Sequence, residues 1–172
     1  MSSSEPTFAE LLADCRTTAI HLEMRDVYYS NERFESWQQG HLTDWNDRDS
    51  WRRSFHQTIE DAVARGVEVR RARIVSEPVT PYIRWEHYVT TANLLAGEQV
   101  RWLPRRMATD LSLPGNDFWV FDDHTARIHH FAGNGDFVGY DFTNDQALIT
   151  HCAAAFEQIW QRAIPHEEYD PA

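Results

Sequence analysis

Two periods of apolar and polar positions alternate along the chain, and they separate helices from strands. Residues 49–66 carry apolar side chains at every fourth position and end in a glycine, which predicts one amphipathic helix. Residues 67–75, VEVRRARIV, are rich in β-branched side chains and predict a strand. Residues 81–96 return to the helical period, and residues 99–104 predict a second strand. Together these segments predict one βαβ unit with parallel strands.

The C-terminal part predicts a hairpin-rich sheet that is closed by a helix. Residues 117–122, 125–131 and 136–142 read as three short strands, and the links between them suit hairpins. A capping box at residues 143–146 then opens a long amphipathic helix that ends at Pro165.

The first third of the chain predicts short helices. Residues 7–15 begin with a capping box and residues 31–40 end at a glycine, as helices do. Residues 16–30 are ambiguous between helix and strand. We therefore expect a single α/β (α+β) domain, in which a helical N-terminal segment (1–65) packs on an α/β half-domain (66–172) with a mixed sheet of about five strands.

Composition indicates a globular protein. The 172 residues are 42% hydrophobic, which suffices for one domain with a core. No apolar run approaches the roughly 20 residues that span a bilayer. The N-terminus lacks the basic and apolar regions of a signal peptide, so we expect a cytoplasmic protein without membrane contact. Cys15 and Cys152 match no metal or redox spacing, and the sequence predicts no metal site and no cofactor.

The charge of the chain excludes further classes of function. The net charge of −11 opposes direct binding to nucleic acid. All 16 basic residues are arginine. The absence of lysine excludes a Walker A loop, a Schiff base and a Ser-Lys pair. Ten of the arginines fall within residues 52–106, which hold only six acids, so the centre of the chain is basic while its flanks are acidic.

The predicted strand 67–75 places two arginines on an apolar face. Arg71 and Arg73 alternate with valines, so they share one side of the strand. A buried guanidinium needs carboxylate partners or an anionic ligand. Glu86 and Asp117 are candidate internal partners. Three interpretations stay open: an internal ion-pair network, a pocket for an acidic or polar small molecule, and a solvated edge strand.

The stretch LPGNDFWVFDDHTARIHH, residues 113–130, invites a catalytic interpretation. Its acids suit a turn between two strands, and His129 and His130 point to opposite faces of a strand, so they cannot chelate one ion together. Asp117 differs, because it precedes a strand at a sheet end, where ligand crevices form. We therefore include it among the candidate ligand-binding residues, which are Arg71, Arg73, Arg84, Glu86, Asp117 and Trp119. No catalytic residue is assigned.

Several specific strings carry a resemblance that covers nearly the whole chain. They are HLEMRDVY (21–28), RGVEVRRARIVSEPVTPYIRWE (65–86), GEQVRWLPR (97–105), LPGNDFWVFDD (113–123) and AFEQIWQRAIPHEEY (155–169). These strings resemble a family of small actinobacterial proteins of unknown function. The order of elements after Gly66 also resembles one half of a phospholipase D-like fold. The family resemblance implies a small helix-turn-helix regulator as partner.

Phospholipase D-like enzymes use a His nucleophile, a Lys two positions later and an Asp further on. Whether Asp122 or Asp123 takes the place of that Asp, the other two positions fall within residues 115–118, which offer neither His nor Lys. Phosphodiester hydrolysis by that mechanism is therefore not expected.

We expect a non-catalytic regulatory or ligand-sensing protein. Two alternatives are a small hydrolase or transferase with acid–base chemistry at Asp117 and Glu86, and an acidic protein-interaction module. A lone half-domain would expose apolar surface, which predicts a homodimer. In the alternative, the N-terminal helices fold back over that surface through their aromatic residues, and the chain stays a monomer.

Overall fold

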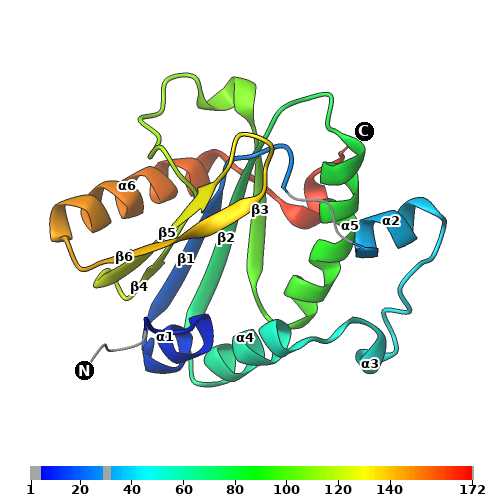
Figure 1. Cartoon of the computed structure of the whole chain (residues 1–172), viewed down its shortest axis with the longest axis horizontal. Helices are drawn as coiled ribbons and strands as arrows, with labels where there is room; N and C mark the ends of the chain where they lie inside the picture. Colours follow the sequence, from blue (N-terminus) through cyan, green and yellow to red (C-terminus); the bar gives the residue numbers. More distant parts are fainter. Residues whose placement is uncertain (1–4, 29–31, 172) are drawn as a thin grey trace.

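The computed structural model describes residues 5–28 and 32–171, and they form an α+β fold around one mixed sheet (Figure 1). The sheet has seven strands in the order β6-β5-β4-β1-β2-β3-β7, two more than the sequence predicts. Their bounds are β1 (Thr18–Glu23), β2 (Glu68–Val75), β3 (Gln99–Pro104), β4 (Phe118–Phe121), β5 (Thr125–Phe131), β6 (Phe137–Thr143) and β7 (Ile164–Pro165).

The expected parallel pairing of residues 67–75 with 99–104 is confirmed, since β2 pairs with β3 in parallel from Arg70 and Gln99 onward. The three predicted hairpin strands are also confirmed: β4, β5 and β6 pair antiparallel with one another in chain order. The sheet therefore has a parallel half and an antiparallel half, and β1 joins them by pairing with β2 and β4.

The description of residues 1–65 as a helical segment is wrong at its most important point, because this segment supplies the central strand β1. Four consecutive residues of β1, Ala19 to Leu22, are buried. A strand that is covered on both faces shows no alternation of apolar and polar positions, which is why its sequence is ambiguous.

Two further details differ from the sequence prediction. The helix expected over residues 49–66 is interrupted, giving α3 (Arg48–Trp51) and α4 (Ser54–Ala64), because Arg53 is extended and donates its N–H to His56 Nδ1 at 3.0 Å. The last long helix, α6 (Gln146–Arg162), is capped by the side chain of Asp145 and not by Thr143.

Helix α6 covers one face of the sheet (Figure 1). Its apolar stripe packs on side chains of β1, β2 and β4 to form the largest core cluster, which includes Ile20, Leu22, Ile74, Phe118, Val120, Ile149, Phe156 and Ile159. The apolar stripe of α6 is the one that the sequence predicts. Burial of these apolar side chains is the main contribution to the stability of the domain.

The opposite face is covered by two separate helical groups. Helices α1 (Phe8–Asp14) and α4 pack over one end, around Leu12, Ile59 and Trp119. Helix α5 (Pro81–Leu95) packs over β3, around Ile83 and Trp102, and the short α2 (Glu32–Gln38) contacts α5. Between these two apolar clusters, β1 and β2 present charged side chains.

The N-terminal aromatic residues pack onto the domain in the way that the monomer alternative requires. The rings of Trp37 and Trp45 contact Tyr88, Phe34 contacts Trp85, and Trp51 is buried. The uncovered face that motivated the homodimer prediction is thus occupied by this chain's own helices. Sedimentation at micromolar concentration still distinguishes the two assemblies.

The paired aspartates of residues 113–130 form a turn, as the structural interpretation predicts. Asp122 and Asp123 have φ angles of 52° and 53°, in the left-handed region that a β4–β5 turn requires. The Asp122 carboxylate accepts hydrogen bonds from Arg16 N, Thr17 N and Thr18 N at 2.7, 2.8 and 3.0 Å. It thereby holds the chain where β1 begins.

Candidate functional site

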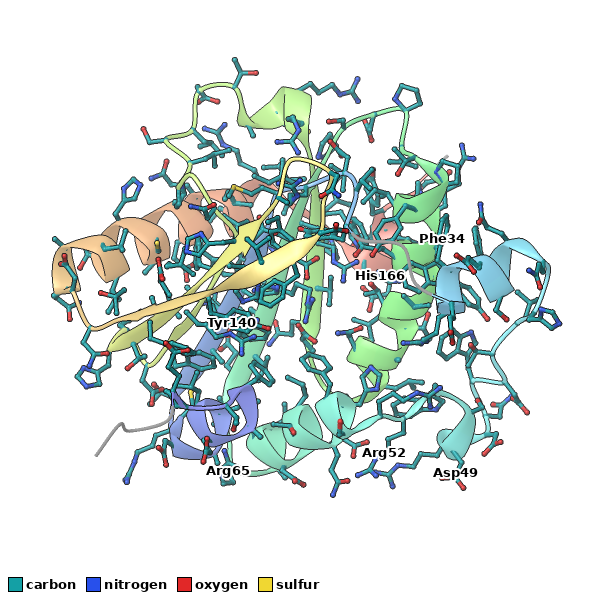
Figure 2. All side chains as sticks on the ribbon, viewed as in Figure 1. Phe34, Asp49, Arg52, Arg65, Tyr140 and His166 are labelled. Atoms are coloured by element: carbon teal, nitrogen blue, oxygen red, sulfur yellow. The ribbon has the colours of Figure 1, made fainter. Side chains whose placement is uncertain are left out.

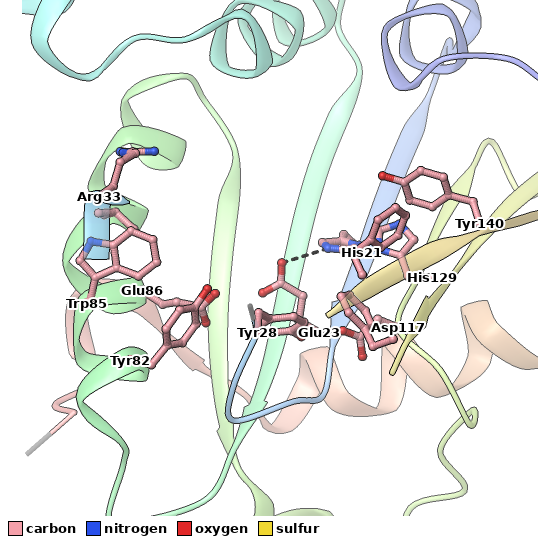
Figure 3. A pocket seen from close by; sticks show the side chains of 13 residues that line it. His21, Glu23, Tyr28, Arg33, Tyr82, Trp85, Glu86, Asp117, His129 and Tyr140 are labelled. Atoms are coloured by element: carbon pink, nitrogen blue, oxygen red, sulfur yellow. Dashed lines mark hydrogen bonds and ion pairs between the residues drawn. The ribbon is translucent and has the colours of Figure 1, made fainter. Parts of the chain in front are cut away.

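A pocket of about 470 Å³ lies over β1, between α5 and the β5–β6 hairpin (Figure 3). Helices α2 and α5 form one wall, and the hairpin forms the other. Figure 3 shows Tyr82 and Trp85 on the first wall, Tyr140 and His129 on the second, and the carboxylates of Glu23 and Glu86 between them. The lining residues are His21, Glu23, Tyr28, Arg33, Tyr82, Trp85, Glu86, Val89, Asp117, His129, Phe131, Phe137 and Tyr140.

Arg71 and Arg73 lie beneath this pocket and are buried, on the same face of β2, as their alternation predicts. Arg71 contacts two carboxylates: Nη1 lies 2.5 Å from Glu23 Oε1 and Nε lies 2.6 Å from Glu98 Oε1. Arg73 Nε lies 2.9 Å from Glu23 Oε2. The interpretation as an internal network therefore describes both arginines.

Glu86 is the network carboxylate that faces the pocket. It is 8% exposed, and its side chain has one charged contact, with Arg73 Nη1 at 3.2 Å. Burial raises the pKa of Glu86 to about 7, because the charged form loses hydration that Arg73 only partly replaces. The predicted pairing of Glu86 with the arginine-bearing strand is thus observed.

Asp117 also lines the pocket but does not pair with Arg71 or Arg73, which corrects its predicted role. Its Oδ2 accepts from the Tyr28 hydroxyl at 2.5 Å and its Oδ1 accepts from Met24 N at 2.9 Å. Burial raises its pKa to about 6, although these two hydrogen bonds act in the opposite direction. Asp117 therefore anchors the segment after β1 that carries Tyr28 into the pocket.

Two histidines complete the floor. His21 Nδ1 donates to Phe118 O at 2.8 Å, its Nε2 lies 3.0 Å from Glu23 Oε1, and its ring stacks on Trp119 at 4.4 Å. His129 is 5.4 Å from His21, measured between ring centroids. Burial lowers the pKa of both rings, that of His129 to about 2.

Two predicted site residues lie outside the lining. Arg84 is exposed on the outer side of α5, with Nε 3.5 Å from Pro171 O, because it is two residues from Glu86 and a helix turns by about 100° per residue. Trp119 is buried under His21 and supports the floor without reaching the pocket.

Sequence reasoning missed several members of the site. Glu23 and His21 lie in the ambiguous stretch, and Glu98 follows a helix-ending glycine, where an acid is ordinarily exposed. For His21 and Glu23 the sequence offered one indication: they are two residues apart, so in a strand they share one face.

Other chemistry is limited. Burial raises the thiol pKa of Cys15 to about 12 and of Cys152 to about 11, so neither is a ready nucleophile. Within residues 5–28 and 32–171, no three His, Cys, Asp or Glu side chains are placed to hold a metal ion. The described helices include none that is both long and apolar enough to cross a membrane.

The sequence profile of a family described as a domain of unknown function, DUF6879, matches residues 6–171. The chain belongs to the DUF6879 family. All residues of the pocket lie inside the matched range, so the site is part of the DUF6879 domain. None of the curated proteins matches the chain.

Among solved structures, the chain is similar to TrmBL2, described as an archaeal chromatin protein with a novel mode of DNA binding. The identity is 11% and the TM-score is 0.47. The similarity covers 90% of this chain and 47% of that one, so the DUF6879 chain spans about half of TrmBL2. Similarity at this level does not establish a shared fold or function.

Proposed function

We propose that this protein binds a small molecule in the pocket over β1 and acts as a non-catalytic, ligand-sensing regulatory protein. One observation carries the proposal: a pocket of ligand size, about 470 Å³, with aromatic walls opens directly onto buried ionised groups. Small-molecule sites are typically concave, largely aromatic and equipped with a few placed polar groups. A buried ion-pair network often adds little net stability compared with apolar packing. Its position beneath a pocket therefore favours a role in ligand recognition.

Binding is favoured over catalysis because most polar groups of the site are already engaged. Both oxygens of Asp117 accept hydrogen bonds, and both nitrogens of His21 contact the protein. No lysine exists in the chain, and the two buried thiols are protonated. A general base must reach its substrate's proton, and of these carboxylates Glu86 is the one that faces the pocket without an accepted hydrogen bond among the described residues.

The regulatory part of the proposal comes from the family resemblance, which implies a helix-turn-helix partner. The net charge of −11 opposes direct contact of this chain with DNA. We propose that ligand occupancy is passed to such a partner, whose basic surface would be complementary to the acidic flanks of this chain.

The first test fills the pocket from α5. Val89 lines the pocket and Leu95 is 50% exposed on the same helix outside it, so Val89→Trp and Leu95→Trp form a matched pair. Native mass spectrometry of the protein from its own cells should show a bound molecule in the wild type and in Leu95→Trp, and none in Val89→Trp. A wild type without any bound molecule, and with no change in melting temperature in a metabolite extract of the same cells, would contradict the proposed function.

A second candidate function is acid–base catalysis by Glu86 and Asp117, favoured by one observation: both line the pocket, with pKa values of about 7 and about 6. Carboxyl groups that titrate near neutrality suit proton transfer. We expect the molecule recovered from the wild type to remain unchanged on incubation with fresh protein. Its conversion by the wild type but not by Glu86→Gln would establish the enzyme instead.

A further inference from the structure

We propose that the ligand of this pocket is a small aromatic cation that presents N–H donors, of the aryl amidine, guanidine or amine class, with Glu86 as its carboxylate partner. This inference rests on the proposed function and adds the chemical class of the ligand. It follows from the walls of the pocket, the free acceptors on its floor and the sign of the charge that lines it.

The walls suit a flat ring. Tyr82 and Trp85 lie on the α5 side (Figure 3), with ring centroids 5.2 Å apart. Phe137 and Tyr140 belong to the hairpin side, with ring centroids 4.4 Å apart. Aromatic rings stack on other rings and attract cations through their negative faces. A volume of about 470 Å³ far exceeds that of a bare metal ion and suits a molecule with one or two rings.

In the described part of the chain, the floor carries carboxylate acceptors that make no hydrogen bond, and the facing Arg73 Nε and Nη1 make none either. The Glu86 carboxylate is buried and accepts no hydrogen bond among the described residues, since its contact with Arg73 lies outside hydrogen-bond geometry. Glu23 Oε2 is in the same position, 2.9 Å from Arg73 Nε but without a hydrogen bond. Buried acceptors of this kind are costly unless a donor satisfies them, and the open side of Glu86 is the pocket.

The charge on the lining selects a cation. Three carboxylic acids line the pocket, namely Glu23, Glu86 and Asp117, whereas the one cation of the described lining is Arg33, whose side chain is at an exposed position of α2. The other nearby arginines are engaged elsewhere: Arg25 and Arg127 stack on the rings of Phe131 and Tyr140, and Arg71 and Arg73 contact the network carboxylates. An anionic ligand would meet the Glu86 and Asp117 carboxyl groups at the pocket surface, and Arg71 and Arg73 are already engaged with the network carboxylates.

The inference predicts that ligand affinity depends on pH. Arg73 and Arg71 from β2, Glu23 from β1 and Asp117 before β4 face Glu86, which is half-protonated near pH 7. A cation binds the ionised form, and that form becomes more abundant as the pH rises through about 7. The affinity for a cation should therefore increase between pH 6 and pH 8, while the affinity for a neutral analogue should not increase.

The experiment uses three aromatic probes of nearly the same shape: benzamidine, which is cationic and only donates; benzamide, which is neutral; and benzoate, which is anionic and only accepts. Titration of the full-length protein is followed through the indole N–H signal of Trp85, assigned with Trp85→Phe. We expect benzamidine to bind at least about tenfold more tightly than benzoate, with benzamide between them.

Matched variants identify the partner. Glu86→Gln should weaken benzamidine roughly tenfold, reduce its pH dependence to the part that Asp117 contributes, and leave benzamide nearly unchanged. Glu68→Gln, at an exposed position at the start of β2, is the control and should change none of these values. Circular dichroism verifies that both variants fold.

The outcomes separate this inference from the proposed function. Tighter binding of benzoate than of benzamidine would overturn the cation class while leaving a ligand-binding protein. Equal binding of all three probes, or binding that Glu86→Gln does not alter, would do the same. If no probe binds at concentrations of about 10 mM, which is about the weakest affinity expected for such fragments, the inference is overturned. The proposed function is then decided separately by native mass spectrometry.

Discussion

Replacement of Arg71 by alanine is expected to lower the free energy of unfolding by about 3–5 kcal/mol, because it leaves buried carboxylates without their cation. Glu98 is 2% exposed and has two partners, Arg71 Nε at 2.6 Å and Asn93 Nδ2 at 2.7 Å. Glu23 would lose Arg71 Nη1 as well. The guanidinium also lies over the rings of Phe55 and Trp119, so the substitution removes packing together with charge.

Two controls give this result its meaning. Arg52 pairs with Glu60 at 2.8 Å on the periphery near α3 (Figure 2), and Arg52→Ala should change the free energy of unfolding by no more than about 1 kcal/mol. The double variant Arg71→Met with Glu98→Gln removes the unpaired buried charge that Glu98 would carry. It should recover part of the free energy of unfolding that Arg71→Ala loses. Urea denaturation at pH 7 measures all four proteins. Equal stability of Arg71→Ala and Arg52→Ala would show that the network is not buried in solution.

Asp122→Ala should cost about 2–4 kcal/mol, since the carboxylate is the shared acceptor that holds the start of β1. It accepts from three consecutive backbone N–H groups and from the Thr17 hydroxyl at 2.7 Å. Asp123 is the matched control. It has nearly the same positive φ but an exposed side chain without a hydrogen bond in the described structure, so Asp123→Ala should cost only about 1 kcal/mol of backbone strain.

The pH dependence of the Asp122 effect has a definite sign. Burial raises the pKa of Asp122, but hydrogen bonds from Thr17, Thr18 and Arg16 outweigh it and hold the pKa well below its ordinary value. A depressed pKa means that the stabilisation is complete above the pKa of the unfolded chain, about 4, and is lost as pH falls toward the folded value. The difference between wild type and Asp122→Ala should therefore shrink steadily below about pH 4. A difference that is constant between pH 7 and pH 3 would contradict the role of the carboxylate.

Local order is where the sequence predicts this protein well. The capping box of α1, the strand 125–131, the βαβ unit and the α6 stripe are all as expected, because caps, periodicity and glycine ends act over a few residues. The burial of Arg71 and Arg73 could also be predicted, since alternation in a strand assigns each side chain to a face. That two guanidinium groups share an apolar face indicated carboxylate partners, an anionic ligand or a solvated edge, and the structure shows carboxylate partners.

The identity of those partners was decided by the tertiary structure. Glu86 was predicted correctly, but Asp117 binds Tyr28 and Met24, and Glu23 and Glu98 take the remaining places. A carboxylate finds its cation through sheet order, and β1 lies between β2 and β4, a position that no local pattern reveals. The pocket has the same origin, because it lies between α5, which ends at Leu95, and a hairpin that begins only at Thr125.

The sequence by itself therefore determined most of the helices and strands after residue 66 and the face on which Arg71 and Arg73 lie, because these depend on short-range periodicity. Only the tertiary structure decided that β1 is central, which acids contact the arginines and which carboxylates line the pocket. These depend on contacts between segments far apart in sequence, whose formation is governed by the packing of the whole sheet.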